Sequence, residues 1–259
     1  MTDLPTAYFV RDGDGFRPTA LTIGPWNSRL QHGGPASALL ARSLEHEAGD
    51  DIFIARVTVE LLRPLPLAPM EITIRPLRVG KQVMWWDVDL VVASKHVARA
   101  TGVGIRREAL DVPAPSLNPP STLPDECEVF EFPFFETDVA YHRSVEIRRI
   151  AGEWSKGPMK AWMRTRQPLV AGETMSSLQR TLTIADASNG IAPCLGLGRH
   201  VFPNPDLTVY RHRESQGEWI SLDSRSVAEA HGVGWVGSEL GDRHGLFGRS
   251  SQSLMVRSM

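Results

Sequence analysis

The chain is poor in cysteine, in net charge and in long apolar runs, and each shortage excludes a class of protein. Only Cys127 and Cys194 occur among 259 residues, with no CxxC pair, which excludes a disulfide framework and a cysteine-zinc site and makes a reducing cytoplasm the expected compartment. The formal net charge is −2 with scattered basic residues, so nucleic acid is not an expected partner. No apolar run approaches about 18 residues, and the first residues lack the pattern of a secretory signal, so neither a membrane span nor a leader is expected.

Familiar catalytic and cofactor motifs are absent or stand in the wrong context. The GxSxG, GxxxxGK[ST] and HExxH patterns do not occur. Residues 232–237 match GxGxxG, but strand-like residues follow instead of the helix that a dinucleotide site needs, so these glycines are expected to relieve crowding between strands. Two arginines flank His212, which argues against a cation site there, and Cys194 is expected to be a buried structural thiol. We therefore expect no metal and no cofactor.

The chain contains an internal repeat. Residues 57–107 align with residues 207–257 at a shift of 150 without a gap, in one register over successive strand-like segments. The identical pairs include Thr58/Thr208, Val59/Val209, Arg63/Arg213, Val83/Val233, Trp85/Trp235, Leu90/Leu240, Arg99/Arg249 and Arg107/Arg257. A repeat of this length indicates duplication of a whole structural unit.

Each half combines a helix with strands that follow it. In the first half a helix is expected after His32-Gly33-Gly34-Pro35, with Gly49 as its end. Strands are expected at about 52–62, 69–79, 82–93 and 96–107. In the third strand the apolar residues alternate with acidic ones, which is typical of a sheet with one buried face. These apolar residues are Met84, Trp86, Val88, Leu90 and Val92.

The second half repeats this plan. A helix is expected to begin after Thr174 as its N-cap and to end at Gly190. Strands are expected at about 206–213, 218–228, 231–241 and 244–256. Five prolines from Pro113 to Pro124 indicate a linker that wraps the surface. The expected fold is α+β, with an N-terminal domain at 1–110, a linker at 111–140 and a C-terminal domain at 141–259.

Three polar residues of the second half depart from the pattern of the first. Gln252 lies in an otherwise small and apolar strand and aligns with Gly102, and Asn204 aligns with Ile54. Asp186 lies on an apolar helical face, where an unpaired carboxylate is costly. Each residue has an ordinary alternative, because Asn204 suits a turn, Gln252 a solvent-facing position and Asp186 a helix end. Their occurrence in one half only indicates a polar site.

The chain resembles a known family over nearly its whole length, most strongly over 174–257. The motifs are HGG followed by ALLAR, IADASNG, FPNPDLTVYRHR and SSQSLMVR, and they are similar to the acyl-CoA thioesterase II type of double-hotdog thioesterases. The resemblance implies two fused hotdog units, each a long helix wrapped by an antiparallel sheet. It also implies a catalytic set of Asp186, Asn204 and Gln252, although the family carries Thr or Ser where this chain has Asn204.

The resemblance implies hydrolysis of an acyl thioester, such as an acyl-CoA, by a positioned water. Asp186 would accept a proton from the water, and the amides of Asn204 and Gln252 would orient it. Substrate binding is assigned to His32, Gly33, Gly34 and Thr208, where the helix start at the glycines would polarise the thioester carbonyl.

The acyl chain and the carrier need further contacts. Trp85, Trp86, Trp162 and Trp235 are candidates for lining an apolar groove, with core packing as the more common role of such residues. Arg211 and Arg213 are candidates for contact with the phosphates of coenzyme A.

Other functions stay open at this stage. A protein that binds acyl thioesters or small apolar ligands without hydrolysing them is the alternative that Asn204 favours. A hotdog dehydratase or hydratase generally pairs an Asp with a His on the catalytic helix, and residues 174–190 contain no histidine. Exposed sheet edges invite pairing, so assembly into a homo-oligomer is a further hypothesis.

Overall fold

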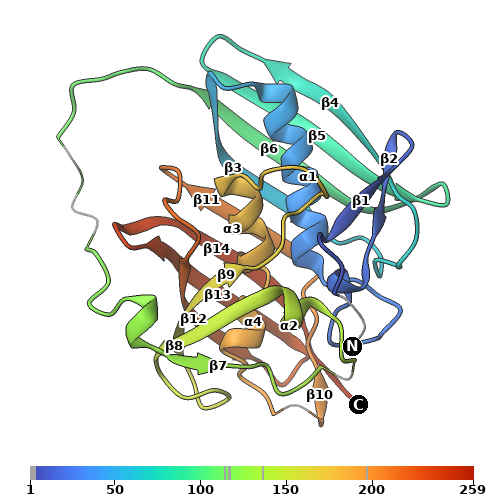
Figure 1. The fold of residues 1–259 in the computed structure, drawn as a ribbon, viewed down its shortest axis with the longest axis vertical. Coiled ribbons are helices and arrows are strands. Elements are labelled where there is room, and N and C mark those ends of the chain that lie inside the picture. Colours follow the sequence, from blue (N-terminus) through green and yellow to red (C-terminus); the bar gives the residue numbers. More distant parts are fainter. Residues whose placement is uncertain (1–3, 114, 116–117, 136, 197) are drawn as a thin grey trace.

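One large antiparallel sheet runs through the molecule. The computed structural model describes residues 4–113, 115, 118–135, 137–196 and 198–259. Eleven strands follow the order β4-β5-β6-β3-β11-β14-β13-β12-β9-β8-β7 from the upper right to the lower left of Figure 1. In chain order the strands are β3 (Ile52–Glu60), β4 (Glu71–Val79), β5 (Val83–Val92), β6 (Lys95–Arg106), β7 (Glu128–Phe130), β8 (Val145–Ala151), β9 (Met159–Thr165), β11 (Asp206–Arg211), β12 (Ile220–Ala228), β13 (Val233–Asp242) and β14 (Gly245–Met255).

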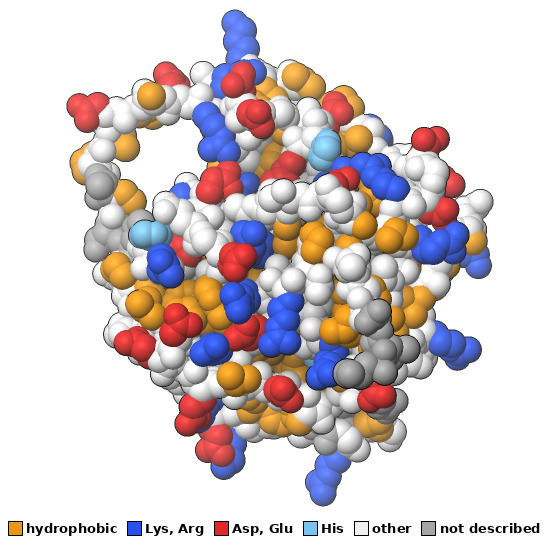
Figure 2. All heavy atoms as spheres, in the orientation of Figure 1, with side chains coloured by type: hydrophobic (Ala, Val, Ile, Leu, Met, Phe, Trp, Pro, Cys, Tyr) orange, Lys and Arg blue, Asp and Glu red, His pale blue; other side chains and the backbone are white. Residues whose placement is uncertain are grey.

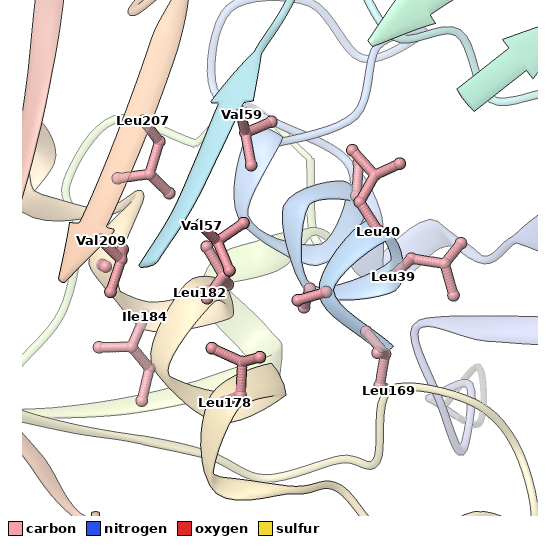
Figure 3. Packing of buried hydrophobic residues seen from close by; sticks show 14 of the residues in the cluster. Leu39, Leu40, Val57, Val59, Leu169, Leu178, Leu182, Ile184, Leu207 and Val209 are labelled. Atoms are coloured by element: carbon pink, nitrogen blue, oxygen red, sulfur yellow. The ribbon is translucent and has the colours of Figure 1, made fainter. Parts of the chain in front are cut away.

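Two helices lie side by side against one face of this sheet. Helix α1 (Gly33–Ala48) and helix α3 (Ser177–Ala185) pack on each other in front of the strands (Figure 1). The start and end of α1 are those expected, because His32 is its N-cap and Gly49 closes it with a φ of 72°. The sheet and the helix pair bury one apolar core, to which β3, β11 and both helices contribute (Figure 3).

Short elements complete the fold. They are the hairpin β1 (Phe9–Asp12) and β2 (Gly15–Pro18), the pair β10 (His200–Val201) and β15 (Arg257–Ser258), the helices α2 (Tyr141–Ser144) and α4 (Ser188–Ile191), and the 3₁₀ turns η1 (Ala20–Thr22) and η2 (Pro124–Glu126). Acidic and basic side chains are interspersed over the face shown in Figure 2. Among the described residues, no helix is long and apolar enough to cross a membrane.

The strand pairing confirms the repeat. β3 pairs with β11 across the middle of the sheet, and Thr58 lies directly opposite its repeat partner Thr208. The pairing is therefore centred on a local two-fold axis that exchanges the halves. The hairpin β5–β6 has a register shift between Leu90 and Val91, and β13–β14 has one between Leu240 and Gly241, at a spacing of 150. A shared irregularity at the same repeat position is strong support for duplication.

The strands that follow each helix agree with the sequence pattern. The alternating residues of β5 are buried towards the helices, from Met84 at 6% exposure to Leu90 at 0%. The 232–237 glycine motif forms a turn and the start of β13, with no helix after it. A Cβ on Gly234 would lie 2.6 Å from the Val227 carbonyl oxygen on β12, so this glycine relieves crowding between strands as expected.

The second helix differs from the expectation at both ends. Its N-cap is Ser176 rather than Thr174, because the Ser176 hydroxyl accepts the N–H of Gln179. The helix ends at Ala185 instead of continuing to Gly190, and α4 follows after Asp186 and Ala187. Asp186 therefore occupies a helix end, although it is buried.

The proline-rich segment does more than connect the halves. Residues 107–113 lead away from the body of the molecule in Figure 1, but Glu128–Phe130 forms β7, the edge strand beside β8. Strands β7, β8 and β9 precede α3 and have no counterpart in the plan of one helix with four following strands. The expectation that 111–140 only wraps the surface was wrong, because residues after Pro124 bury aromatic rings such as Phe132.

Candidate active site

Asp186 lies where the C-terminal end of α3 meets the N-terminal end of α1. It is 4% exposed and holds the C-cap position of α3. A carboxylate is unfavourable at a helix C-terminus and favourable at an N-terminus, so the start of α1 compensates for the end of α3. The two helices approach closely because of two glycines. A Cβ on Gly33 would lie 2.9 Å from Asp186 Oδ2, and one on Gly34 would lie 2.4 Å from the Thr183 carbonyl oxygen.

Two amides converge on the Asp186 carboxylate, as the sequence predicts. Asn204 Nδ2 donates to Asp186 Oδ1 at 2.8 Å and also to the Asp206 carbonyl oxygen at 3.1 Å. Gln252 Nε2 donates to the same Oδ1 and to the Asp186 carbonyl oxygen, both at 3.2 Å. Asn204 precedes β11 and Gln252 lies on β14, so three separate segments meet at one carboxylate.

His32 completes the surroundings of this carboxylate. Its Nδ1 lies 2.9 Å from Asp186 Oδ2 and 3.1 Å from the Gly34 amide nitrogen. One ring nitrogen cannot donate to the first and accept from the second at once, so the tautomer decides which contact is a hydrogen bond. The ring is stacked on Tyr141 at 3.9 Å. Burial, with smaller contributions from Tyr8 and Asp186, raises the pKa of Tyr141 well above its usual value, so its hydroxyl stays protonated and donates to the Thr183 carbonyl.

A cavity of about 500 Å³ opens beside Asp186. Of the predicted site residues, Asp186, Asn204, His32 and Gly33 line it. Its wall is mainly apolar, as expected of a site for an acyl chain. The apolar residues are Pro25, Trp26, Leu30, Leu61, Leu62, Pro64, Leu65, Phe132, Phe134, Phe135, Ala187, Pro193, Val201, Phe202, Pro203, Pro205 and Met255.

Three predicted site residues do not line the cavity. Gln252 is 1% exposed and contacts the Asp186 carboxylate without lining the cavity. Gly34 serves the contact between the helices. Thr208 points to the opposite face of the sheet, since its neighbours Leu207 and Val209 face the helices (Figure 3) and its Oγ1 lies 3.2 Å from Thr58 Oγ1. The assignment of Thr208 to substrate binding was therefore wrong.

The predicted tryptophans and arginines have other roles. Trp86 and Trp162 are buried in the sheet, while Trp85 and Trp235 lie on its far face, and none of the four lines the cavity. Arg211 is 6% exposed and forms an ion pair with Glu214. Arg213 forms a bidentate pair with Asp242. The guanidinium groups of both arginines are thus engaged inside the protein, and neither is available to a phosphate.

Sequence reasoning missed the aromatic wall and the charged rim of the cavity. Phe132, Phe134 and Phe135 come from the segment expected to be a linker, and Phe134 stacks on Trp154 at 6.0 Å. The signal was the density of phenylalanine, with four among residues 130–135. Arg63 also lines the cavity.

Cys194 is partly exposed, whereas the sequence suggested a buried thiol. The described residues contain no group of three or more His, Cys, Asp or Glu placed for a metal ion.

Comparison with known proteins follows the same division into halves. Residues 22–104 match the model of the acyl-CoA thioesterase N-terminal domain, and residues 124–256 match that of the acyl-CoA thioesterase C-terminal domain. No curated protein matches the chain in sequence.

Solved structures with the same fold are similar over nearly the full length. A putative thioesterase from Novosphingobium aromaticivorans is 21% identical, with a TM-score of 0.77 and coverage of 96% of this chain and 98% of that chain. A putative thioesterase II from Thermobifida fusca is 17% identical, with a TM-score of 0.72 and coverage of 97% and 96%. An acyl-CoA thioesterase II from Mycobacterium marinum is 14% identical, with a TM-score of 0.70 and coverage of 96% and 94%.

At these identities the neighbours show the fold, and the two domain models show the family. The expected α+β double hotdog is confirmed. The chain belongs to the acyl-CoA thioesterase family, with the double-hotdog fold of the thioesterase II type.

Proposed function

We propose that this protein hydrolyses an acyl thioester with a water molecule activated by Asp186. The observation that carries the proposal is the convergence of Asn204, Gln252 and His32 on one buried carboxylate in the wall of an apolar cavity. Burying a carboxylate is costly unless donors surround it, and a buried polar cluster beside a cavity is typical of a functional site. The substrate class follows from the family.

The reaction divides among these groups as follows. Asp186 takes a proton from water, the hydroxide adds to the thioester carbonyl carbon, and the resulting oxyanion collapses to expel the thiolate. The proton held by Asp186 returns to the thiolate, which leaves as the free thiol. Asn204 has its Nδ2 engaged with Asp186, so its Oδ1 is the atom that would accept from the water. The Gly33 N–H at the start of α1 would stabilise the oxyanion.

His32 and Gln252 position Asp186 in this scheme. With its proton on Nδ1, His32 donates to Oδ2, while Gln252 donates to Oδ1, so both carboxylate oxygens are fixed. Stacking on Tyr141 keeps the His32 ring in place. The arrangement leaves Asp186 as the group that reacts with water, and no covalent intermediate is needed.

A protein that binds acyl thioesters without hydrolysing them is the second candidate. Asn204 favours it, since the family carries Thr or Ser at this position, and a hydroxyl both donates to and accepts from a water in a small space. If the amide prevents turnover, Asn204→Thr will create hydrolysis that the unmodified protein lacks. If the amide is competent, the variant will change an existing rate.

The experiment is a thiol-release assay with short-, medium- and long-chain acyl-CoAs, on the wild type, Asp186→Asn and Asn204→Thr. Turnover in the wild type and its loss in Asp186→Asn would support hydrolysis at this site. Binding of the panel without turnover in the wild type would favour the second candidate. Because His32 pairs with Asp186 from the other helix, the panel includes a 3-hydroxyacyl-CoA, and water loss without thiol release would identify a dehydratase.

The cellular compartment and the oligomeric state are predicted from the sequence alone. The scarcity of cysteine still predicts the cytoplasm, and the homo-oligomer stays a hypothesis for solution measurement.

A further inference from the structure

The local two-fold axis gives the active site a counterpart at the other end of the helix pair. At that end the C-terminus of α1 meets the N-terminus of α3. Glu45 of α1 accepts from the Ser176 hydroxyl at 2.8 Å and from Gln179 Nε2 at 2.9 Å. Burial raises the pKa of Glu45 despite these donors. The counterpart therefore also holds a carboxylate, here half-buried, but the cavity described above does not extend to it.

The repeat explains why one end is open and the other closed. Residues 61–65 (LLRPL) all line the cavity, and their repeat partners 211–215 (RHRES) belong to the closed end. There Arg211 donates to the Ile54 carbonyl at 2.8 Å and to Glu214 at 2.7 Å. At the open end the repeat partners of Arg211 and Glu214 are Leu61 and Pro64. Neither side chain fills the space beside Asp186.

One identical pair in these segments has two different environments. Arg213 is held by both carboxylate oxygens of Asp242, at 2.6 and 2.8 Å, and by the Gly245 carbonyl at 2.8 Å. The repeat partner of Asp242 is Val92. Arg63, the partner of Arg213, therefore lacks its internal anion, and its guanidinium has no ion pair or hydrogen bond with any described residue.

The position of Arg63 indicates which part of a bound thioester it would contact. It is exposed, and it is the one Lys or Arg among the described residues that line the cavity. An acyl chain occupies the apolar interior, so an exposed group at the edge of the cavity meets the carrier end of the thioester. That end carries phosphate, for which the planar guanidinium fork is well suited.

We propose that Arg63 binds a phosphate of the carrier that bears the acyl thioester, because Arg63 lacks the carboxylate that pairs with its repeat partner Arg213. The inference rests on the proposed function in taking an acyl thioester as ligand. It assigns to Arg63 the phosphate contact that the sequence suggested for Arg211 and Arg213.

The test compares Arg63→Ala with the wild type on acyl-CoA and on the phosphate-free acyl-pantetheine with the same acyl group. Loss of one charge-assisted contact at an exposed site is expected to raise KM for acyl-CoA about tenfold, with kcat unchanged. KM for acyl-pantetheine should not change, and Arg63→Lys should recover part of the loss. Arg225→Ala is the matched control, because Arg225 is an exposed and unpaired arginine on β12, away from the cavity.

The phosphate has two sources, which a third probe separates. S-acyl-4′-phosphopantetheine carries the phosphate that coenzyme A shares with acyl carrier proteins. A tenfold effect with this probe assigns Arg63 to the shared phosphate, and an effect with acyl-CoA alone assigns it to the nucleotide phosphates. An equal effect on acyl-pantetheine, or no effect on any of the three, would overturn the proposal.

Calorimetry keeps this inference separate from catalysis. Free coenzyme A should bind Arg63→Ala about tenfold more weakly than the wild type, whereas pantetheine should bind both alike. If Arg63 controls coenzyme A binding but no thioester is hydrolysed, the proposed function fails and the phosphate contact stands. If hydrolysis occurs and Arg63→Ala binds coenzyme A as tightly as the wild type does, the proposed function stands and the phosphate contact fails.

Discussion

The carboxylate of Asp186 lies where both burial and a helix C-terminus disfavour a negative charge. It lies at the C-terminal end of α3 and is held there by donors from other segments. We expect Asp186→Asn to lower kcat by about 10²-fold or more, the scale of a general base. The melting temperature should not fall, because the amide oxygen still accepts from Asn204 and Gln252, and the other tautomer of His32 accepts from the new amide nitrogen. Wild-type turnover in a folded variant would remove Asp186 from the chemistry.

Gln252 is expected to act through Asp186 alone. Its side chain donates to the carboxylate but does not reach the cavity, so Gln252→Leu removes a positioning contact while keeping a similar volume. We expect kcat to fall about tenfold or more with KM nearly unchanged, because a hydrogen bond to a charged group is lost. Steady-state kinetics on one acyl-CoA, with thermal melting as a check on folding, measure this. A rise in KM at constant kcat would instead place Gln252 in contact with the substrate.

At the residue level, sequence comparison of the two halves found the polar centre but not its surroundings. Asp186, Asn204 and Gln252 stood out because their repeat partners or neighbours are apolar or small, and the structure brings all three together. The choice of Thr208 was wrong because adjacent strand residues face opposite sides of a sheet. Arg63 could not be singled out, since its repeat partner is identical and only the loss of the facing anion distinguishes them.

Among the elements, the contact between α1 and α3 depends on a missing side chain. A Cβ on Gly34 would lie 2.4 Å from the Thr183 carbonyl oxygen, and a backbone atom in a packed helix cannot move away cheaply. We expect Gly34→Ala to destabilise the protein by about 1–3 kcal/mol, although alanine is the better helix former. Gly196→Ala is the control, since its Cβ would meet nothing within 4 Å. Equal unfolding midpoints in denaturant for both variants would contradict this close approach.

The elements that repeat were predictable, and those that do not were missed. Strands β3 to β6 and β11 to β14 follow from alternation and turn residues, and the repeat supports each with a second copy. Strands β7, β8 and β9 join the large sheet ahead of α3, whereas the hairpin β1–β2 ahead of α1 forms a separate sheet, in which Phe16 bridges to Met70 next to β4. The break in α3 was not visible because Asp186 and Ala187 keep dihedral angles near those of a helix.

For the molecule as a whole, acid sensitivity should follow from buried ion pairs. Burial alone would raise the pKa of Asp242, but hydrogen bonds from Arg213 and from the N–H groups of Gln216 and His244 outweigh it and lower the pKa below its usual 3.8. A lowered folded-state pKa contributes stability that is present above the unfolded value and is lost as the pH falls through the folded value. This contribution should therefore begin to fall below about pH 4 and be lost as the pH passes the folded value.

The comparison of wild type with Asp242→Asn measures this. The variant leaves Arg213 with a neutral partner, so its melting temperature should be lower than that of the wild type at pH 7. The difference should narrow as the pH falls below about 4, where the wild type also loses the charge. Glu45 acts in the opposite direction, because burial raises its pKa and its contribution is lost as the pH rises. A difference that is constant from pH 7 to pH 3 would contradict the role of the Asp242 charge.

The outer edges of the sheet bear on the predicted homo-oligomer. Strand β4 carries Pro76 and a register shift beside it, and β7 has three residues. Both features oppose the addition of a further strand. A homo-oligomer of this chain is therefore expected to form through a surface other than these two sheet edges.

The two halves should stay together without a covalent link. They are joined by the pairing of β3 with β11 and by the packing of α1 on α3, whereas residues 107–113 run away from the body (Figure 1). We retain 1–110 and 141–259 as the proposed domains, and Leu110 at the boundary is 66% exposed. A protease site inserted after Leu110 should therefore be cut in the native protein. The product should give two bands in denaturing electrophoresis but a single peak at an unchanged elution volume in size-exclusion chromatography. Separation of the fragments would show that the connection, rather than the shared sheet and core, holds the halves in place.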